Sequence, residues 1–269
     1  MNKLILGRYF PGDSWIHRLD PRAKLVAAIY FIFVLFLANN WQTYVFLWLF
    51  TTAVILLSNI SIRTYLRGVR PLIWLILFTV FLQVLFTAGG EIYVDLGPIT
   101  ISKFGLINGF YIFCRFIMII FISTVVTLTT KPIDLTDGMN ALLRPLRKLK
   151  VPVDELSLML SISLRFIPNL LDETQKVMDA QRARGTEFGE GSLVKQMKTL
   201  VPIFLPLFVS SLNRAEDMAN VMEVRGYQSD VKRSTFRQLS WQQKDTISLL
   251  VMAMLTVALL VLRSNGFGH

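Results

Sequence analysis

Apolar residues gather into five long runs along this chain, and most charged residues lie between those runs. The runs cover about residues 25–37, 41–57, 71–86, 104–128 and 247–262. Since a helix of about 20 apolar residues crosses the hydrocarbon core of a bilayer, such runs are typical of transmembrane helices. The pattern therefore predicts an all-α polytopic membrane protein with about five transmembrane helices.

The composition supports the same class of protein. Hydrophobic residues make up 53% of the 269-residue chain and charged residues only 17%, whereas charged residues make up about 25% of a soluble domain. Cys114 is the only cysteine, so no internal disulfide can form. Between the third and fourth runs, apolar and polar residues alternate over 91–98, which predicts a small external hairpin or loop.

The net charge of +10 is distributed unevenly, and this predicts the orientation of the chain in the membrane. Cations crowd the N-terminal segment, the link 58–70 and the segment 131–244, whereas the other two links hold a single cation, Lys103. Because cytoplasmic segments carry the excess of Lys and Arg, the N-terminus and the segment 131–244 are expected in the cytosol and the C-terminus outside. This orientation explains most of the positive charge, so binding to nucleic acid is not needed to account for it. We expect the cations also to contact anionic membrane lipids.

Three regions follow from this pattern. Residues 1–130 form an N-terminal membrane domain with four spans, 131–240 a cytosolic helical domain, and 241–269 contain the C-terminal transmembrane helix. Apolar periodicity predicts about three helices in the middle region, over about 132–149, 153–184 and 192–225. The first parts of the last two are too apolar for soluble helices. They are therefore expected at the membrane boundary or under another hydrophobic protein.

Prolines interrupt these predicted helices. Pro145 is expected to kink or end the first, and Pro168 to bend the second. Pro202 and Pro206 lie four residues apart in the third, where each removes a backbone hydrogen bond and clashes with the preceding turn. The pair predicts a hinge or a sharp bend; a static kink or a break between two separate helices is the alternative.

The second and third helices of the middle region end in the same way. Ala183-Arg184-Gly185 closes one and Val224-Arg225-Gly226 closes the next, with the two arginines 41 residues apart. An arginine at a helix end complements the helix dipole and projects a rigid fork of five donors, and glycine then lets the chain turn away. A single Arg-Gly pair is ordinary capping, but two copies with matched upstream layouts favour docking onto a dimeric cytosolic partner.

Enzymatic and self-sufficient transport functions have little support in the residues. The two histidines, His17 and His269, form no cluster with metal-ligand spacing, and the P-loop pattern is absent. We therefore expect no enzyme activity, no metal and no cofactor on this chain. Arg115 is a cation within the fourth apolar run, and none of the five runs contains an Asp or a Glu. The absence of an acid in the runs argues against an ion-coupled carrier. A stand-alone channel or carrier, or a membrane-boundary lipid enzyme using the carboxylates of Asp172, Glu173, Glu216 and Asp217, remains the alternative.

The paired arginine motifs carry a resemblance to a known family. Together with the opening Leu19-Asp20-Pro21-Arg22-Ala23-Lys24, the order of spans and insertion, and Leu200-Val201-Pro202-Ile203-Phe204-Leu205-Pro206, they resemble the transmembrane T component (EcfT) of energy-coupling factor transporters. These are ABC-type importers of vitamins and metal ions in the bacterial plasma membrane. The resemblance covers nearly the whole chain, and Val224 in place of alanine in the second motif is a mild variation.

The resemblance implies partners and site residues. Two cytosolic P-loop ATPase subunits, as a heterodimer or a homodimer, would bind ATP and Mg²⁺ and receive one arginine motif each. The last two helices of the insertion would be coupling helices that form an apolar platform for a separate, exchangeable substrate-binding membrane subunit, the S component. Implied ATPase-docking residues are Ala183, Arg184, Gly185, Val224, Arg225 and Gly226. The platform would draw on Leu156, Met159, Leu160, Leu164, Ile167, Leu171, Leu200, Ile203 and Leu207, with the hinge at Pro202 and Pro206.

Overall fold

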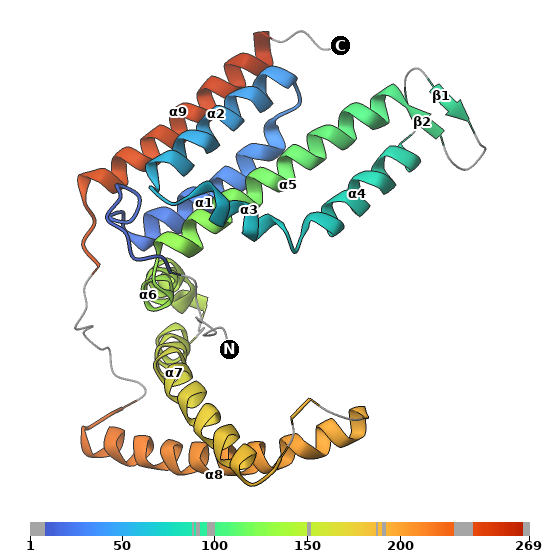
Figure 1. Ribbon diagram of the computed structural model, residues 1–269. Coiled ribbons are helices and arrows are strands. Elements are labelled where there is room, and N and C mark those ends of the chain that lie inside the picture. The colour runs from blue at the N-terminus through green and yellow to red at the C-terminus, as the bar shows by residue number, and fades with distance from the viewer. Residues whose placement is uncertain are drawn as a thin grey trace. The chain divides into compact units, whose positions relative to one another are not determined.

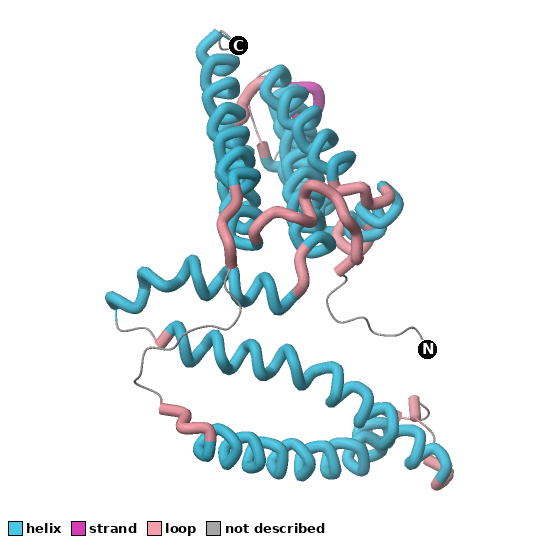
Figure 2. Tube along the Cα trace, turned by 90° about the vertical axis from the view of Figure 1, so that its left-hand side faces the viewer, coloured by secondary structure: helices cyan, strands magenta, loops and turns pink. Residues whose placement is uncertain are grey.

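The computed structural model describes residues 9–87, 89, 92–95, 100–149, 152–186, 188–189, 192–228 and 239–265. The chain divides into two compact units (Figures 1 and 2). The first unit combines Met1–Leu142 with Leu239–His269, and the second is Leu143–Gln238. His269 and part of the segment 91–98 lie outside the described residues.

The first unit is a helical bundle in which α5 packs against α1, α2, α3 and α4, while α9 packs against α1 and α2 (Figure 1). Strands β1 and β2 pair antiparallel between α4 and α5, so the expected hairpin or loop is a hairpin. The elements are α1 (Pro21–Leu37), α2 (Trp41–Leu57), α3 (Ile62–Val69), α4 (Ile73–Phe86), β1 (Ile92–Asp95), β2 (Thr100–Ser102), α5 (Lys103–Thr129), α6 (Pro132–Leu143) and α9 (Gln243–Asn265).

The second unit consists of two long helices after a short 3₁₀ helix, η1 (Arg144–Leu149). The helix α7 (Val153–Ala183) has 31 residues, and α8 (Leu193–Val224) has 32. Pro145 falls within η1, just after α6 ends. Proline disfavours the α-helical conformation of the residue before it, so the end of α6 at this point agrees with the prediction. By contrast, α8 continues through Pro202 and Pro206, so a break between two separate helices at this point is wrong.

The class of fold is confirmed as an all-α polytopic membrane protein, to which one small hairpin is added. A helix occupies each of the five predicted runs, but α5 and α9 are the two described helices long and apolar enough to cross a membrane by themselves. The pair α3 and α4, bent by 60°, brings the number to three if it forms one span. The shorter α1 and α2 have 17 residues each, which is the lower end of the length that crosses a bilayer.

The third predicted span begins later than its sequence pattern indicates. The predicted run begins at Pro71, but Pro71 lies in the turn between α3 and α4, and α4 begins at Ile73. Residues 62–69, which belong to the expected charged link 58–70, form the helix α3. Tyr65 and Val69 are buried on one side of α3, and the Tyr65 hydroxyl lies 2.7 Å from that of Ser58. The arginines of this amphipathic helix are exposed, and their charges made the segment resemble a loop in the sequence.

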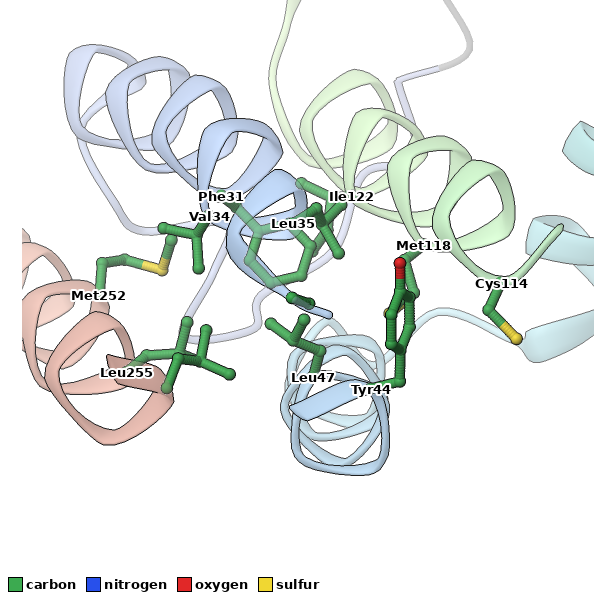
Figure 3. Close-up of a cluster of buried hydrophobic side chains, with 12 residues drawn as sticks. Phe31, Val34, Leu35, Tyr44, Leu47, Cys114, Met118, Ile122, Met252 and Leu255 are labelled. Atoms are coloured by element: carbon green, nitrogen blue, oxygen red, sulfur yellow. The ribbon is translucent and has the colours of Figure 1, made fainter. Parts of the chain in front are cut away.

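The core of the first unit forms where four helices meet (Figure 3). Apolar side chains from the second half of α1 and the first half of α2 contact the middle of α5 and the middle and second half of α9. Figure 3 shows Cys114 of α5 among these side chains, and its thiol is buried. The labelled members are Phe31, Val34, Leu35, Tyr44, Leu47, Cys114, Met118, Ile122, Met252 and Leu255.

Candidate functional site

The end of α7 has a specific capping geometry. Arg184 follows the last helical residue, and Gly185 adopts a left-handed conformation with φ of +86°. The Gly185 N–H donates to the Arg182 carbonyl at 2.9 Å, and the Thr186 N–H donates to the Gln181 carbonyl at 3.0 Å. These two hydrogen bonds define a Schellman motif, which satisfies carbonyls that a helix end otherwise leaves unpaired.

The end of α8 repeats this geometry. Arg225 occupies the same position, and Gly226 has φ of +72°. The Gly226 N–H donates to the Glu223 carbonyl at 2.8 Å, and the Tyr227 N–H donates to the Met222 carbonyl at 2.9 Å. The two arginine motifs are therefore two copies of one backbone structure, as the prediction of glycine-terminated helices requires.

Both motif arginines are exposed and available for binding. Within the part of the chain that the structure describes, neither the Arg184 nor the Arg225 guanidinium makes a hydrogen bond or an ion pair. The neighbouring Arg182 is engaged differently, since its Nη1 donates to Asp179 Oδ1 at 3.0 Å. The helix ends thus present two fork-shaped donor groups without acceptors, while a nearby arginine is already paired.

An ion pair ties α7 to α8, which cross in Figure 1. Arg214 Nη2 on α8 donates to Glu173 Oε2 on α7 at 3.1 Å, and both side chains are about two-thirds buried, with 33% and 27% exposed. The Arg214 guanidinium carbon also lies 5.5 Å from the centre of the Phe166 ring, within the range of a cation–π contact. Glu173, a carboxylate that the lipid-enzyme alternative would use, is thus paired with a cation.

The nine residues of the expected platform differ in exposure. Leu156, Met159, Leu160 and Leu200 are 43–62% exposed. Leu164, Ile167, Leu171 and Leu207 are partly exposed. Ile203 is only 7% exposed and offers little surface, in contrast to the expectation for this position.

Neighbouring aromatic residues on α8 offer more apolar surface than Ile203. Phe204 and Phe208 are 68% and 51% exposed, and their rings stack with centres 6.1 Å apart. Leu205 between them is 61% exposed. Residues four apart lie on one face of a helix. The spacing of Phe204 and Phe208 in the sequence therefore indicates an aromatic surface on α8 that the predicted platform did not include.

Comparison with known proteins places the chain in a family. A family model described as CbiQ, cobalt transport protein, matches residues 12–235. The energy-coupling factor transporter transmembrane protein EcfT 1 of Listeria monocytogenes is 56% identical over 265 residues, which cover 98% of this chain and 100% of that protein. The chain belongs to the EcfT family.

Two further EcfT proteins match with similar coverage. The protein of Lacticaseibacillus paracasei is 55% identical over 98% of this chain and 100% of its own length. The protein of Bacillus subtilis is 48% identical over 95% of this chain and 97% of its own. The EcfT resemblance is thus confirmed: this chain is a transmembrane component of an energy-coupling factor transporter, and its multi-helix fold fits a multi-pass membrane location.

The opening Leu19-Asp20-Pro21-Arg22 segment of this EcfT chain fixes the start of α1. Asp20 Oδ1 accepts the Arg22 N–H at 2.8 Å, and proline occupies the first helical position. An acidic N-cap and a proline at the first position both favour a helix start. The helix therefore begins at Pro21, four residues before the expected apolar run.

A buried carboxylate joins this start to α9. Asp245 is 1% exposed; its Oδ1 accepts the Asp20 N–H at 2.7 Å, and its Oδ2 accepts the Gln242 N–H at 2.8 Å. Asp245 therefore caps its own helix and binds a backbone group 225 residues earlier. This double contact explains why α9 begins at Gln243 and not at the start of the apolar run near Ile247.

A buried lysine closes the end of α5 beside this carboxylate. Lys24 is 6% exposed, and its ammonium donates to the Thr129 carbonyl at 3.0 Å, the Thr130 hydroxyl at 3.2 Å and the His17 carbonyl at 3.3 Å. A cation at a helix C-terminus stabilises the carbonyls that the helix leaves unpaired. Asp20, Lys24 and Asp245 together hold the ends of α1, α5 and α9 in one junction, which we call the helix-end junction.

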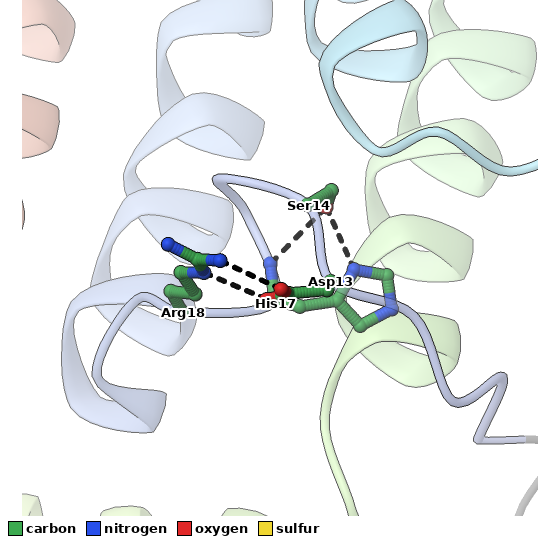
Figure 4. A network of polar contacts seen from close by, with 4 residues as sticks. All are labelled: Asp13, Ser14, His17 and Arg18. Atoms are coloured by element: carbon green, nitrogen blue, oxygen red, sulfur yellow. Dashed lines mark hydrogen bonds and ion pairs between the residues drawn. The ribbon is translucent and has the colours of Figure 1, made fainter.

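The segment before α1 is held by local polar contacts (Figure 4). Arg18 donates twice to the exposed Asp13 carboxylate, at 2.6 and 2.7 Å, and this hydrogen-bonded cation lowers the pKa of Asp13. His17 Nδ1 lies 2.7 Å from the Ser14 hydroxyl and Nε2 lies 3.0 Å from the Phe10 carbonyl. Because a carbonyl only accepts, Nε2 carries the proton, and His17 serves to shape this segment.

Arg115, the cation within the fourth predicted span, contacts aromatic side chains. Its Nη2 donates to the Tyr44 hydroxyl at 2.9 Å, and its guanidinium carbon lies 4.9 Å from the centre of the Phe36 ring. Tyr44 in turn stacks on Tyr111 with ring centres 4.6 Å apart. These contacts satisfy part of the guanidinium, whose Nε is buried without a partner among the described residues.

A cavity of about 260 Å³ lies within the first unit between α1, α2, α5 and α9. Its wall is almost wholly hydrocarbon, and apart from the indole N–H of Trp15 the described polar groups on it belong to Lys24, Thr129 and Ser248. The Lys24 ammonium already donates to three protein oxygens, and the Ser248 hydroxyl donates to the Asp245 carbonyl at 2.8 Å. The cavity therefore offers no spare donor on these groups with which to recognise a polar ligand.

Proposed function

We propose that this chain is the coupling subunit of an energy-coupling factor importer, transmitting ATP-driven motion of two cytosolic ATPases to a separate substrate-binding membrane subunit. The observation that carries the proposal is the pair of matched helix ends on α7 and α8. Each end presents an exposed arginine, Arg184 or Arg225, directly before a left-handed glycine. Two copies of one binding element suit a partner that itself has two equivalent grooves.

The chemistry of arginine supports docking in a protein groove. A guanidinium keeps its charge and offers planar, paired donors that match a carboxylate or the carbonyl end of a helix. The rigid helix before each arginine fixes the direction in which its guanidinium points at the partner. The turn at Gly185 or Gly226 directs the following chain away from the end of the helix. In this proposal the N-terminus and the second unit lie in the cytosol and the C-terminus lies outside.

The apolar surfaces of α7 and α8 support contact with a hydrophobic membrane partner. Exposed leucines lie along both helices and exposed phenylalanines along α8, and methionines such as Met159 and Met197, which are 62% and 70% exposed, lie among them. Methionine adapts to differently shaped partners because its side chain is unbranched and flexible. We assign this surface to an exchangeable S component that binds a vitamin or a metal ion as cargo.

In this proposal the chain has no catalytic role of its own. ATP and Mg²⁺ bind the two P-loop ATPase subunits, and this chain binds no cofactor. The ATPases move the ends of α7 and α8, and the apolar surface of these helices passes the movement to the S component.

Affinity purification of the tagged chain from its native membrane tests the proposal. We expect two P-loop ATPase subunits and at least one small hydrophobic protein to co-purify in stoichiometric amounts, identified by mass spectrometry. Purification of the chain alone, together with channel or hydrolase activity in the same sample, would contradict the proposal.

Replacing Pro202 and Pro206 together by alanine is expected to slow substrate uptake several-fold while leaving the complex assembled. Each proline removes a helical hydrogen bond, at a cost of about 3 kcal/mol in a soluble helix interior, so alanine stiffens α8. The measurement is the initial rate of uptake into proteoliposomes. Pro132→Ala is the matched control, because proline at the first position of α6 interrupts no helical hydrogen bond. An unchanged uptake rate in the double variant would identify the two prolines as static bends.

A further inference from the structure

The ion pair between α7 and α8 occupies equivalent positions of the two helices. Glu173 and Arg214 are 41 residues apart, the same separation as Arg184 and Arg225. Each member of the pair therefore precedes the arginine at the end of its own helix by 11 residues. At a rise of 1.5 Å per residue, both arginines lie about 16 Å along their helices from the ion pair.

This equal spacing gives the crossing a symmetric layout. A contact between positions that are not 41 residues apart would leave one arginine nearer to the crossing than the other. A partner with two equivalent grooves requires both arginines at matching positions, and the observed register supplies them. The Glu173–Arg214 contact meets this condition, so it lies equally far from the two helix ends.

The contact is charged and largely buried, which fixes the register more strictly than apolar packing does. Arg214 is held by the Glu173 carboxylate and by the Phe166 ring, while its Nη1 is buried without a hydrogen-bond partner among the described residues. Sliding one helix by a turn, about 5.4 Å, would separate the charges and leave both partly buried without a partner. Leucines and phenylalanines along the same helices could exchange one apolar neighbour for another at little cost.

We propose that Glu173 and Arg214 form the pivot of the coupling helices, which fixes their register so that movements at the two arginine ends are transmitted together. They act as positioning residues, since neither contacts substrate or nucleotide. This inference rests on the proposed function. It adds that coupling depends on the crossing as well as on the helix ends.

Uptake per ATP hydrolysed is the functional test. In the complete complex, Glu173→Gln and Arg214→Gln should each reduce this ratio about tenfold, with the ATPase subunits still co-purifying and still hydrolysing ATP. The exchanged pair, Glu173→Arg with Arg214→Glu, should recover at least half of the wild-type ratio because it restores opposite charges at the crossing. Asp179→Asn is the matched control, since it breaks an exposed ion pair within α7 alone.

A distance measurement tests the pivot without transport. Spin labels at Ala183→Cys and Val224→Cys, in a Cys114→Ala background of the full chain in nanodiscs, report the separation of the two helix ends. The distance distribution should be narrow with the native pair, broad with Glu173→Gln or Arg214→Gln, and narrow again with the exchanged pair. The Asp179→Asn control should leave it narrow.

The outcomes separate this inference from the function on which it rests. Equal distance distributions in the native and single-variant chains, or an unchanged ratio of uptake to ATP hydrolysis, would overturn the pivot. Absence of ATPase subunits from the wild-type preparation would instead overturn the proposed function, and the spin-label result would then still report whether the pair fixes the register.

Discussion

Replacing Arg184 and Arg225 together by alanine is expected to abolish substrate uptake and the co-purification of the ATPase subunits. In the structure both guanidinium groups are exposed and have no acceptor among the described residues, so their binding energy is available to a partner. Removing one member of a desolvated charge pair in an interface costs about 2–5 kcal/mol. Each single variant should therefore weaken ATPase binding by at least about 30-fold, since 1.4 kcal/mol corresponds to a tenfold change.

Three control variants make the result specific to these positions. Arg184→Lys and Arg225→Lys keep the charge but lose the planar fork, so we expect an intermediate loss. Arg182→Ala removes an exposed arginine that pairs with Asp179 within α7 and should leave binding near the wild-type level. Binding is measured by titrating purified ATPase subunits onto the chain in nanodiscs. Full binding and uptake in the double alanine variant would rule out the docking role.

Replacing Asp245 by alanine is expected to destabilise the first unit strongly. The carboxylate is 1% exposed and accepts backbone N–H groups from Asp20 and Gln242, and alanine would remove both hydrogen bonds and leave the Asp20 N–H buried without a partner. A buried donor without a partner costs about 1–3 kcal/mol, and the lost bond to the partly buried Gln242 N–H adds to this. The melting temperature in detergent, followed by tryptophan fluorescence, should fall by roughly 5–10 °C.

Two comparison variants distinguish the loss of hydrogen bonds from a general effect of charge. Asp245→Asn retains one acceptor oxygen and should lower the melting temperature by less than alanine does. Asp13→Ala removes an acid from an exposed ion pair with Arg18 and should change the melting temperature little. A melting temperature for Asp245→Ala equal to that of the wild type would show that the helix-end junction does not stabilise the fold.

Much of the helical architecture could be predicted because its signals are local. The glycines at 185 and 226 marked the ends of α7 and α8 to within a residue, since a left-handed position favours glycine. The acids Asp154 and Glu155 in the first turn of α7 are a local signal of the same kind for a helix start. The two arginine motifs were found for this reason, because each is read from three consecutive residues.

Contacts between distant parts of the chain could not be predicted from one sequence. The sequence identified Asp245 only as a charge near the start of an apolar run, because its second contact lies 225 residues away. Likewise, Glu173 and Arg214 become partners only once the crossing of α7 and α8 is known. The short helix α3 was missed because its cations resembled a charged link, although Tyr65 and Val69 follow helical spacing.

The glycines after the two arginines restrict how this family can vary. A side-chain carbon added at Gly185 or Gly226 would meet no other heavy atom within 4 Å, yet the positive φ angles of +86° and +72° strain nearly every other residue. Asparagine tolerates this backbone conformation best after glycine. Within this chain both positions therefore require a backbone shape and not a small side chain, so we expect glycine or asparagine there in other members of the family.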